Sequence, residues 1–153
     1  MTNYLYFGKN KVEILTLFEG TNLTLADILH PDKVVNQFGE TAVFFIQEEE
    51  QLRYLLHVGH NINHKNVYGE SVLHKEDKSH EMLELFILYG AFVDIRDHDG
   101  YTPFLESRDL GIMKLFLKHG ANVNARNHHG KGFLDFPIDQ EKRNFLIENG
   151  YKV

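Results

Sequence analysis

The sequence predicts an all-α solenoid of short helix–turn–helix units with a helical cap at its N-terminus. Two observations predict it: glycines recur at two fixed places in a unit of 30 or 31 residues, and an apolar stripe precedes each glycine of the second series. The first series is Gly39, Gly69, Gly100 and Gly130, and the second is Gly59, Gly90, Gly120 and Gly150. One such unit is too small to bury its own apolar face, so the units must stack.

We expect one domain over residues 1–153, consistent with 42% hydrophobic residues. Residues 1–35 are expected to form the cap and an insertion, and about four repeats follow at 36–65, 66–96, 97–126 and 127–153. In the insertion, Thr24 and Asp27 have the spacing of a capping box for a short helix, which Pro31 is expected to end.

Each repeat is expected to contain two helices joined by hairpin-like turns. The second helix is the clearer one, since segments 82–87 and 112–117 place apolar residues three and four apart on one broad face. The second glycine would end this helix in the left-handed conformation, while Asn, Asp and the first glycine suit tight turns. Near the C-terminus, Pro137 is expected to interrupt or shift a first helix, and the polar segment 139–143 to face water.

Two motifs in the repeats resemble the ankyrin family. Segments 99–105 (DGYTPFL) and 69–74 (GESVLH) resemble the ankyrin opening Gly-x-Thr-Pro-Leu-His, and each leads to a Gly-Ala-x-Val-Asn/Asp text. The resemblance covers roughly residues 36–153 and implies an ankyrin-repeat solenoid. Ankyrin units usually have about 33 residues, so these shorter units predict shortened first helices or a clipped turn. The opening histidine of the family is present only at His74. Phe44, Leu105 and Asp135 replace it in the other units, so the hydrogen bonds that this histidine makes to the backbone are in question there.

Composition restricts the class of protein. The chain has no cysteine, which excludes thiol chemistry and suits a reducing cytoplasm. The N-terminus lacks the pattern of a signal peptide, and no apolar run approaches the ~18 residues of a membrane span. With 22 acidic and 16 basic side chains, the net charge of −6 disfavours a nucleic acid partner and favours a basic protein. We expect no membrane partner. We expect the protein alone to be a monomer.

Several histidines lie close together in the sequence and are candidates for metal ligands. The tightest histidine clusters are His57, His60 and His64, and the pair 128–129, but Gly59 should end the helix that carries His57 and prevent convergence. We therefore expect surface histidines and no metal, although a histidine-dependent metal binder or hydrolase remains an alternative.

Other short motifs also favour structural roles. The acidic run 48–50 is interpreted as a solvated helix start, the tripeptide 30–32 lacks the helical hairpin of a J-domain, and segment 130–132 lacks the spacing of a phosphate loop. No other catalytic motif is found, so we predict no enzyme and no cofactor.

The ankyrin resemblance implies a concave face, lined by turn tips and first helices, that grips a protein partner. The implied partner-binding residues are Gln37, Phe38, Glu40, Lys65, Val67, Tyr68, Glu70, Arg96, His98, Asp99, Tyr101, Arg126, His128, His129 and Lys131. The aromatic members are typical of interface anchors; polar turns with scattered aromatic residues are the alternative. Acidic residues at the far end of the first helices are expected to form a second, negative strip: Glu48, Glu49, Glu50, Glu76, Asp77, Glu106 and Asp109.

A small array without another recognisable module predicts that binding itself is the activity. Small ankyrin proteins that resemble this one accompany polymorphic toxins in bacteria, where some are immunity proteins, and a negative inhibitor would suit a basic, nucleic-acid-cleaving toxin. The alternative is an effector or viral ankyrin adaptor that recruits a host protein.

Overall fold

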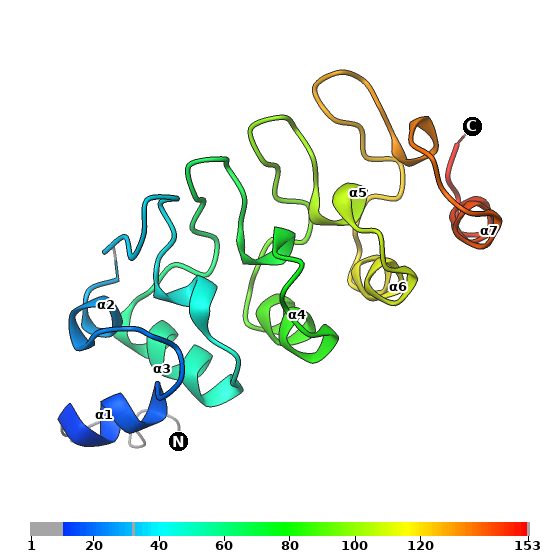
Figure 1. Ribbon diagram of the computed structural model, residues 1–153. Helices are drawn as coiled ribbons and strands as arrows, with labels where there is room; N and C mark the ends of the chain where they lie inside the picture. Colours follow the sequence, from blue (N-terminus) through cyan, green and yellow to red (C-terminus); the bar gives the residue numbers. More distant parts are fainter. Residues whose placement is uncertain (1–10, 32, 153) are drawn as a thin grey trace.

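The helices form a single-file stack in the computed structural model, which describes residues 11–31 and 33–152 (Figure 1). The α-helices are α1 (Lys11–Leu17), α2 (Leu25–Leu29), α3 (Glu49–Val58), α4 (His80–Leu88), α5 (Pro103–Glu106), α6 (Leu110–Lys118) and α7 (Gln140–Glu148). The same described residues contain three 3-10 helices: η2 (Ala42–Phe45), η3 (Val72–His74) and η4 (Phe133–Asp135). The described residues contain no strand. The predicted all-α solenoid is confirmed.

The first helix of every unit is short, as predicted. η2 and α5 have four residues each, and η3 and η4 have three. Thr102 begins α5 by accepting a hydrogen bond from the Leu105 backbone N–H at 3.2 Å, with Pro103 in the first turn. η4 ends at Asp135, so Pro137 lies between η4 and α7. The expectation that Pro137 interrupts or starts a helix is therefore wrong, because the short helix has already ended.

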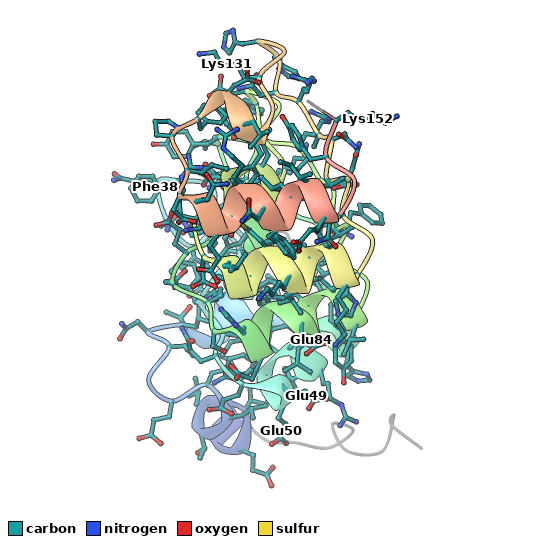
Figure 2. All side chains as sticks on the ribbon, turned by 90° about the vertical axis from the view of Figure 1, so that its right-hand side faces the viewer. Phe38, Glu49, Glu50, Glu84, Lys131 and Lys152 are labelled. Carbon is teal, nitrogen blue, oxygen red and sulfur yellow. The ribbon has the colours of Figure 1, made fainter. Side chains whose placement is uncertain are left out.

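The second helices are longer and form a parallel row (Figure 2). Each of the last three begins at a side chain that caps its first turn: Ser79, Asp109 and Asp139 accept from backbone N–H groups at 3.2, 2.8 and 2.8 Å. α3 ends at Gly59, whose φ of 107° is left-handed as predicted.

The core runs along the stack between neighbouring units. Phe86, Phe104, Phe116 and Phe133 are all fully buried. The rings of Phe104 and Phe133 come from successive first helices and lie 5.4 Å apart. Each unit thus covers the apolar face of the next, which is the source of stability in a repeat array.

The cap contains the predicted short helix. Asp27 Oδ2 accepts from the Thr24 backbone N–H at 2.7 Å, and Thr24 Oγ1 accepts from the Asp27 N–H at 3.3 Å, so the capping box is confirmed. α2 ends at Leu29, before Pro31. The Gln51 side chain donates to the Leu17 carbonyl at 3.0 Å and joins the cap to α3. The part of the predicted cap at residues 1–10 lies outside the described residues.

In the last unit, Asp135 makes the backbone hydrogen bond that the opening histidine makes at His74. His74 Nδ1 accepts from the Ser71 backbone N–H at 3.1 Å, and in the last unit Asp135 Oδ2 accepts from the Gly132 N–H at 2.6 Å. Phe44 and Leu105 have no polar side-chain atom for this bond. The expected loss is thus corrected for the last unit, because a carboxylate supplies the same acceptor.

Candidate protein-binding surface

Four turn tips of the same construction project from the stack. Each is built around an Asn or Asp whose Oδ1 accepts from the backbone N–H groups two and four residues later. In the second turn, for example, Asn66 Oδ1 accepts from Tyr68 at 2.9 Å and from Glu70 at 3.0 Å. The equivalent residues of the other turns are Asn36, Asp97 and Asn127.

Backbone hydrogen bonds join each tip to the next. The N–H groups of Val67, His98 and His128 donate to carbonyls of the preceding tip, those of Phe38, Tyr68 and Asp99, at 2.8, 2.9 and 2.9 Å. Figure 1 shows the four tips side by side along one edge. The side chains at the tips therefore start from a continuous, hydrogen-bonded frame.

Basic side chains between the tips reinforce this frame. Lys65 Nζ donates to the Arg96 carbonyl at 2.6 Å, and Arg96 Nη1 donates to the Arg126 carbonyl at 2.7 Å. Arg126 Nη1 donates to the Gly130 carbonyl at 3.0 Å. These three predicted binding residues are exposed, but each already has a hydrogen-bond partner in the protein.

The first two tips present apolar side chains to water. Phe38, Val67 and Tyr68 are 41%, 52% and 55% exposed, and the two rings lie 6.4 Å apart. We call these three residues the aromatic tip; Figure 2 shows Phe38 projecting away from the helices. Tyr101 is different, because it is half-buried with its ring 6.0 Å from that of Phe136.

The remaining predicted residues divide into an exposed and an inward group. Gln37, His98, Asp99, His128, His129 and Lys131 are exposed. Glu70 is half-buried, whereas Glu40 is only 6% exposed and accepts from Lys75 Nζ at 2.8 Å. Burial raises the pKa of Glu40, but the hydrogen bonds from Lys75 and Asn36 outweigh burial and hold this pKa below its ordinary value. The Glu40 carboxylate thus has an internal partner.

A groove lies beside the tips and the short helices. It consists of two hollows of about 570 and 220 Å³, both lined by His74, Lys75, Glu76 and Glu106. The larger one is also lined by Glu40, Glu70, Asp77 and Lys78. Both lysines of the groove are engaged: Lys75 pairs with Glu40, and the buried Lys78 Nζ lies 3.3 Å from Asp77 Oδ2 and donates to the Ile46 carbonyl at 3.4 Å.

We call this feature the acidic groove, because six carboxylates line its two hollows: Glu40, Glu70, Glu76, Asp77, Glu106 and Asp109. Four members of the predicted negative strip, Glu76, Asp77, Glu106 and Asp109, line it. Asp109 lines only the smaller hollow, where it also caps α6. Glu49 and Glu50 lie in the first turn of α3 and do not line either hollow (Figure 2).

Burial shifts the pKa of two groove residues, Glu106 and His74, toward the neutral form. Burial raises the pKa of the Glu106 carboxyl to about 7, and nearby carboxylates, Asp97 first among them, act in the same direction. Burial lowers the pKa of His74 below its ordinary value of 6.5, opposed by a hydrogen bond to the Tyr101 carbonyl at 3.3 Å. The sequence predicted that Glu106 belongs to a negative strip and gave no signal that its side chain would be half-buried.

The histidines are dispersed over structural roles. His60 is buried with Nε2 2.8 Å from the Ile28 carbonyl, and His64 Nε2 lies 2.8 Å from the Gly39 carbonyl. Among the described residues, no three His, Asp or Glu side chains converge as metal ligands would. Over the same part of the chain, no helix combines the length and apolar character needed to cross a bilayer.

Comparison with known families gives one match. Residues 99–128 match the family model described as ankyrin repeat. The comparison with curated proteins found no match. The matched segment contains part of the third turn tip, α5, α6 and the start of the fourth tip. It supports the ankyrin-repeat resemblance of the solenoid and indicates a protein-interaction module, a class that is typically not enzymatic.

Proposed function

We propose that this protein binds one protein partner along its turn tips and acidic groove, and that it inhibits the partner by covering it. The observation that supports this best is the aromatic tip, where three large apolar side chains stand about half exposed on a hydrogen-bonded frame. Exposed aromatic residues on a defined scaffold are typical anchors of protein interfaces. Because the frame is already ordered, binding would lose little backbone entropy.

The charge of the surface supports a basic partner. The chain has a net charge of −6. Six carboxylates of the described residues line the groove beside the tips, against two lysines and Arg108, and both lysines are internally paired. Such a field favours approach of a positively charged surface. In its most specific form, the proposal is that this is a cytoplasmic immunity protein, monomeric on its own, that neutralises a basic, nucleic-acid-cleaving toxin. The absence of cysteine suits that compartment.

The aromatic tip provides the first experiment. The double variant Phe38→Ala, Tyr68→Ala should weaken partner binding by more than ~2 kcal/mol, roughly thirtyfold in Kd, while its melting temperature stays near that of the wild type. Phe92→Ala is the matched control, since Phe92 is 66% exposed in the turn after α4. Calorimetry with the partner recovered by affinity capture measures both. Unchanged affinity in the double variant would remove the turn tips from the interface.

The inhibitory role is tested separately, with the product of the adjacent gene as the candidate toxin. Co-expression with wild-type protein should restore growth of cells that make this product, and the double variant should restore it less. A product that is harmless, or toxicity that the wild type leaves unchanged, would reject the immunity role and leave binding as such intact.

A further inference from the structure

We propose that the smaller hollow of the acidic groove is a receptor for one lysine or arginine side chain of the partner, with Glu106 as its counter-ion. The proposal rests on the proposed function, because it assigns a chemistry to the surface that this function uses. It follows from a carboxylate oxygen that has no hydrogen-bond partner among the described residues, a cavity with apolar side chains in its wall and the size of one long side chain, and the distribution of charge around both.

Glu106 is the last residue of α5 and lines both hollows. Its Oε2 atom is buried from water and has no hydrogen-bond partner among the described residues. Burying a carboxylate oxygen without a donor costs free energy, and a donor that also brings a positive charge would remove most of that cost. An incoming ammonium or guanidinium group supplies both.

Over the described part of the chain, the charged groups around Glu106 do not supply a counter-ion for its carboxylate. Carboxylates face it from the second turn (Glu70), from the segment after η3 (Glu76) and from the third turn (Asp97), and all three raise its pKa. Arg108 and Asp109 also line the smaller hollow. Arg108 lowers the pKa of Glu106, but its guanidinium lies 5.7 Å from the Phe136 ring centroid, and Asp109 caps α6. On η3 and beside it, His74 is buried with a pKa below its ordinary value, and Lys75 is paired with Glu40.

The walls of the smaller hollow fit the stem of such a side chain. Leu73, Leu83, Ile112 and Phe116 line it together with Pro103, and its volume is about 220 Å³. Lysine and arginine bury their aliphatic stems against apolar surface while the charged end meets a counter-ion. A divalent metal ion is a poorer occupant, since no three ligands converge among the described residues.

Occupancy should depend on pH with a defined sign. A cation binds the ionised form of Glu106 better than the neutral form, and the pKa of about 7 means that a large share of the protein must lose a proton first. Affinity should therefore rise as pH increases from about 6 to 8, and binding should lower the pKa of Glu106. His74 is close enough to contribute, because its protonation would repel the ligand and act in the same direction.

The experiment uses a blocked tripeptide, acetyl-Gly-Arg-Gly-amide, as the probe. Its citrulline counterpart is the neutral, near-isosteric control, and acetyl-Gly-Lys-Gly-amide tests the ammonium form. Titration of isotope-labelled protein, followed by NMR, should shift the Glu106 carboxyl carbon and the backbone signals of Leu73 and Ile112 with the cationic peptides only. Glu106→Gln should weaken binding about tenfold, whereas the exposed Glu148→Gln on α7 should leave it unchanged.

The outcomes separate this proposal from the proposed function. Equal binding of the citrulline peptide, or unchanged binding by Glu106→Gln, would overturn the receptor while the partner experiments stand unaffected. If Glu106→Gln does not fold, the wild type decides: a Glu106 titration midpoint that stays near 7 in saturating arginine peptide would overturn the proposal. If the partner experiments fail but the cationic peptides bind as expected, the proposed function is rejected and the receptor stands.

Discussion

The backbone N–H of His128 donates a hydrogen bond of 2.9 Å to the Asp99 carbonyl, and this bond brings His128 against the neighbouring Gly100. A Cβ on Gly100 would lie 2.7 Å from the His128 backbone nitrogen and 2.5 Å from its Cδ2. Gly100 also has a φ of +84°, which side chains rarely adopt. The contact between adjacent tips therefore depends on a glycine for two separate reasons.

Gly100→Ala should destabilise the protein by roughly 2–4 kcal/mol, because left-handed strain adds to a steric clash with a neighbouring backbone. Gly120→Ala is the control: its φ is +88°, but a Cβ there meets nothing within 4 Å, so the expected cost is only about 1 kcal/mol. Urea unfolding of both variants gives the difference. Equal losses would contradict the close approach of the tips.

Lys131→Glu should stabilise the last turn. In the first two turns the Asn side chain donates to a Glu four residues later, Asn36 to Glu40 at 2.7 Å and Asn66 to Glu70 at 2.8 Å. In the last turn the equivalent residue is Lys131, and the buried Asn127 Nδ2 has no hydrogen-bond partner among the described residues. Supplying the acceptor should add about 0.5–1.5 kcal/mol to the free energy of unfolding.

Lys131→Ala serves as the control for that change, since it removes the lysine without providing an acceptor. Thermal and urea unfolding of the two variants should differ by the value of the new hydrogen bond. If the Lys131→Glu variant is no more stable than the Lys131→Ala variant, the Asn127 amide must already have a hydrogen-bond partner of another kind.

Glu106→Gln should make the protein more stable at pH 8 and change it less at pH 4. A carboxyl whose pKa is raised by folding, from 4.5 to about 7, destabilises the folded state once the unfolded chain ionises. Stability from this group is therefore lost as pH rises from about 4.5 through 7. Because the side chain is partly exposed, we expect a gain of roughly 1–2 kcal/mol at pH 8. Unfolding curves at the two pH values measure it, and a gain independent of pH would contradict the burial of this charge.

His74 should make the protein sensitive to acid. Its pKa is lowered by burial, so the stability that the neutral ring provides is present above its unfolded pKa of about 6.5 and is lost as pH falls below that value. Protonation would also remove the Nδ1 acceptor of the Ser71 N–H. The difference in unfolding free energy between wild type and His74→Gln should shrink from pH 7.5 to pH 5. The exposed His129→Gln should show no such trend.

Local features could be predicted from the sequence alone. The capping box of Thr24 and Asp27, the end of α3 at Gly59 and the shortened first helices depend on residues near one another in the chain. The repeated glycines indicated stacked units because a short apolar stripe has to be covered by a neighbour. Asp135 could not be predicted in the same way. The sequence showed that the opening histidine is missing there, but it did not show that the carboxylate accepts the equivalent hydrogen bond from the Gly132 N–H.

The candidate surface was also predicted only in part from the sequence. The sequence by itself determined the period, the turns and which side chains stand at the tips, since backbone conformation is dictated by near neighbours. Only the tertiary structure decided that Glu40 turns inward to Lys75, that Tyr101 packs near Phe136, and that Glu106 is half-buried between units. Burial and charge are sums over residues far apart in the chain, so they become defined only when the units are stacked.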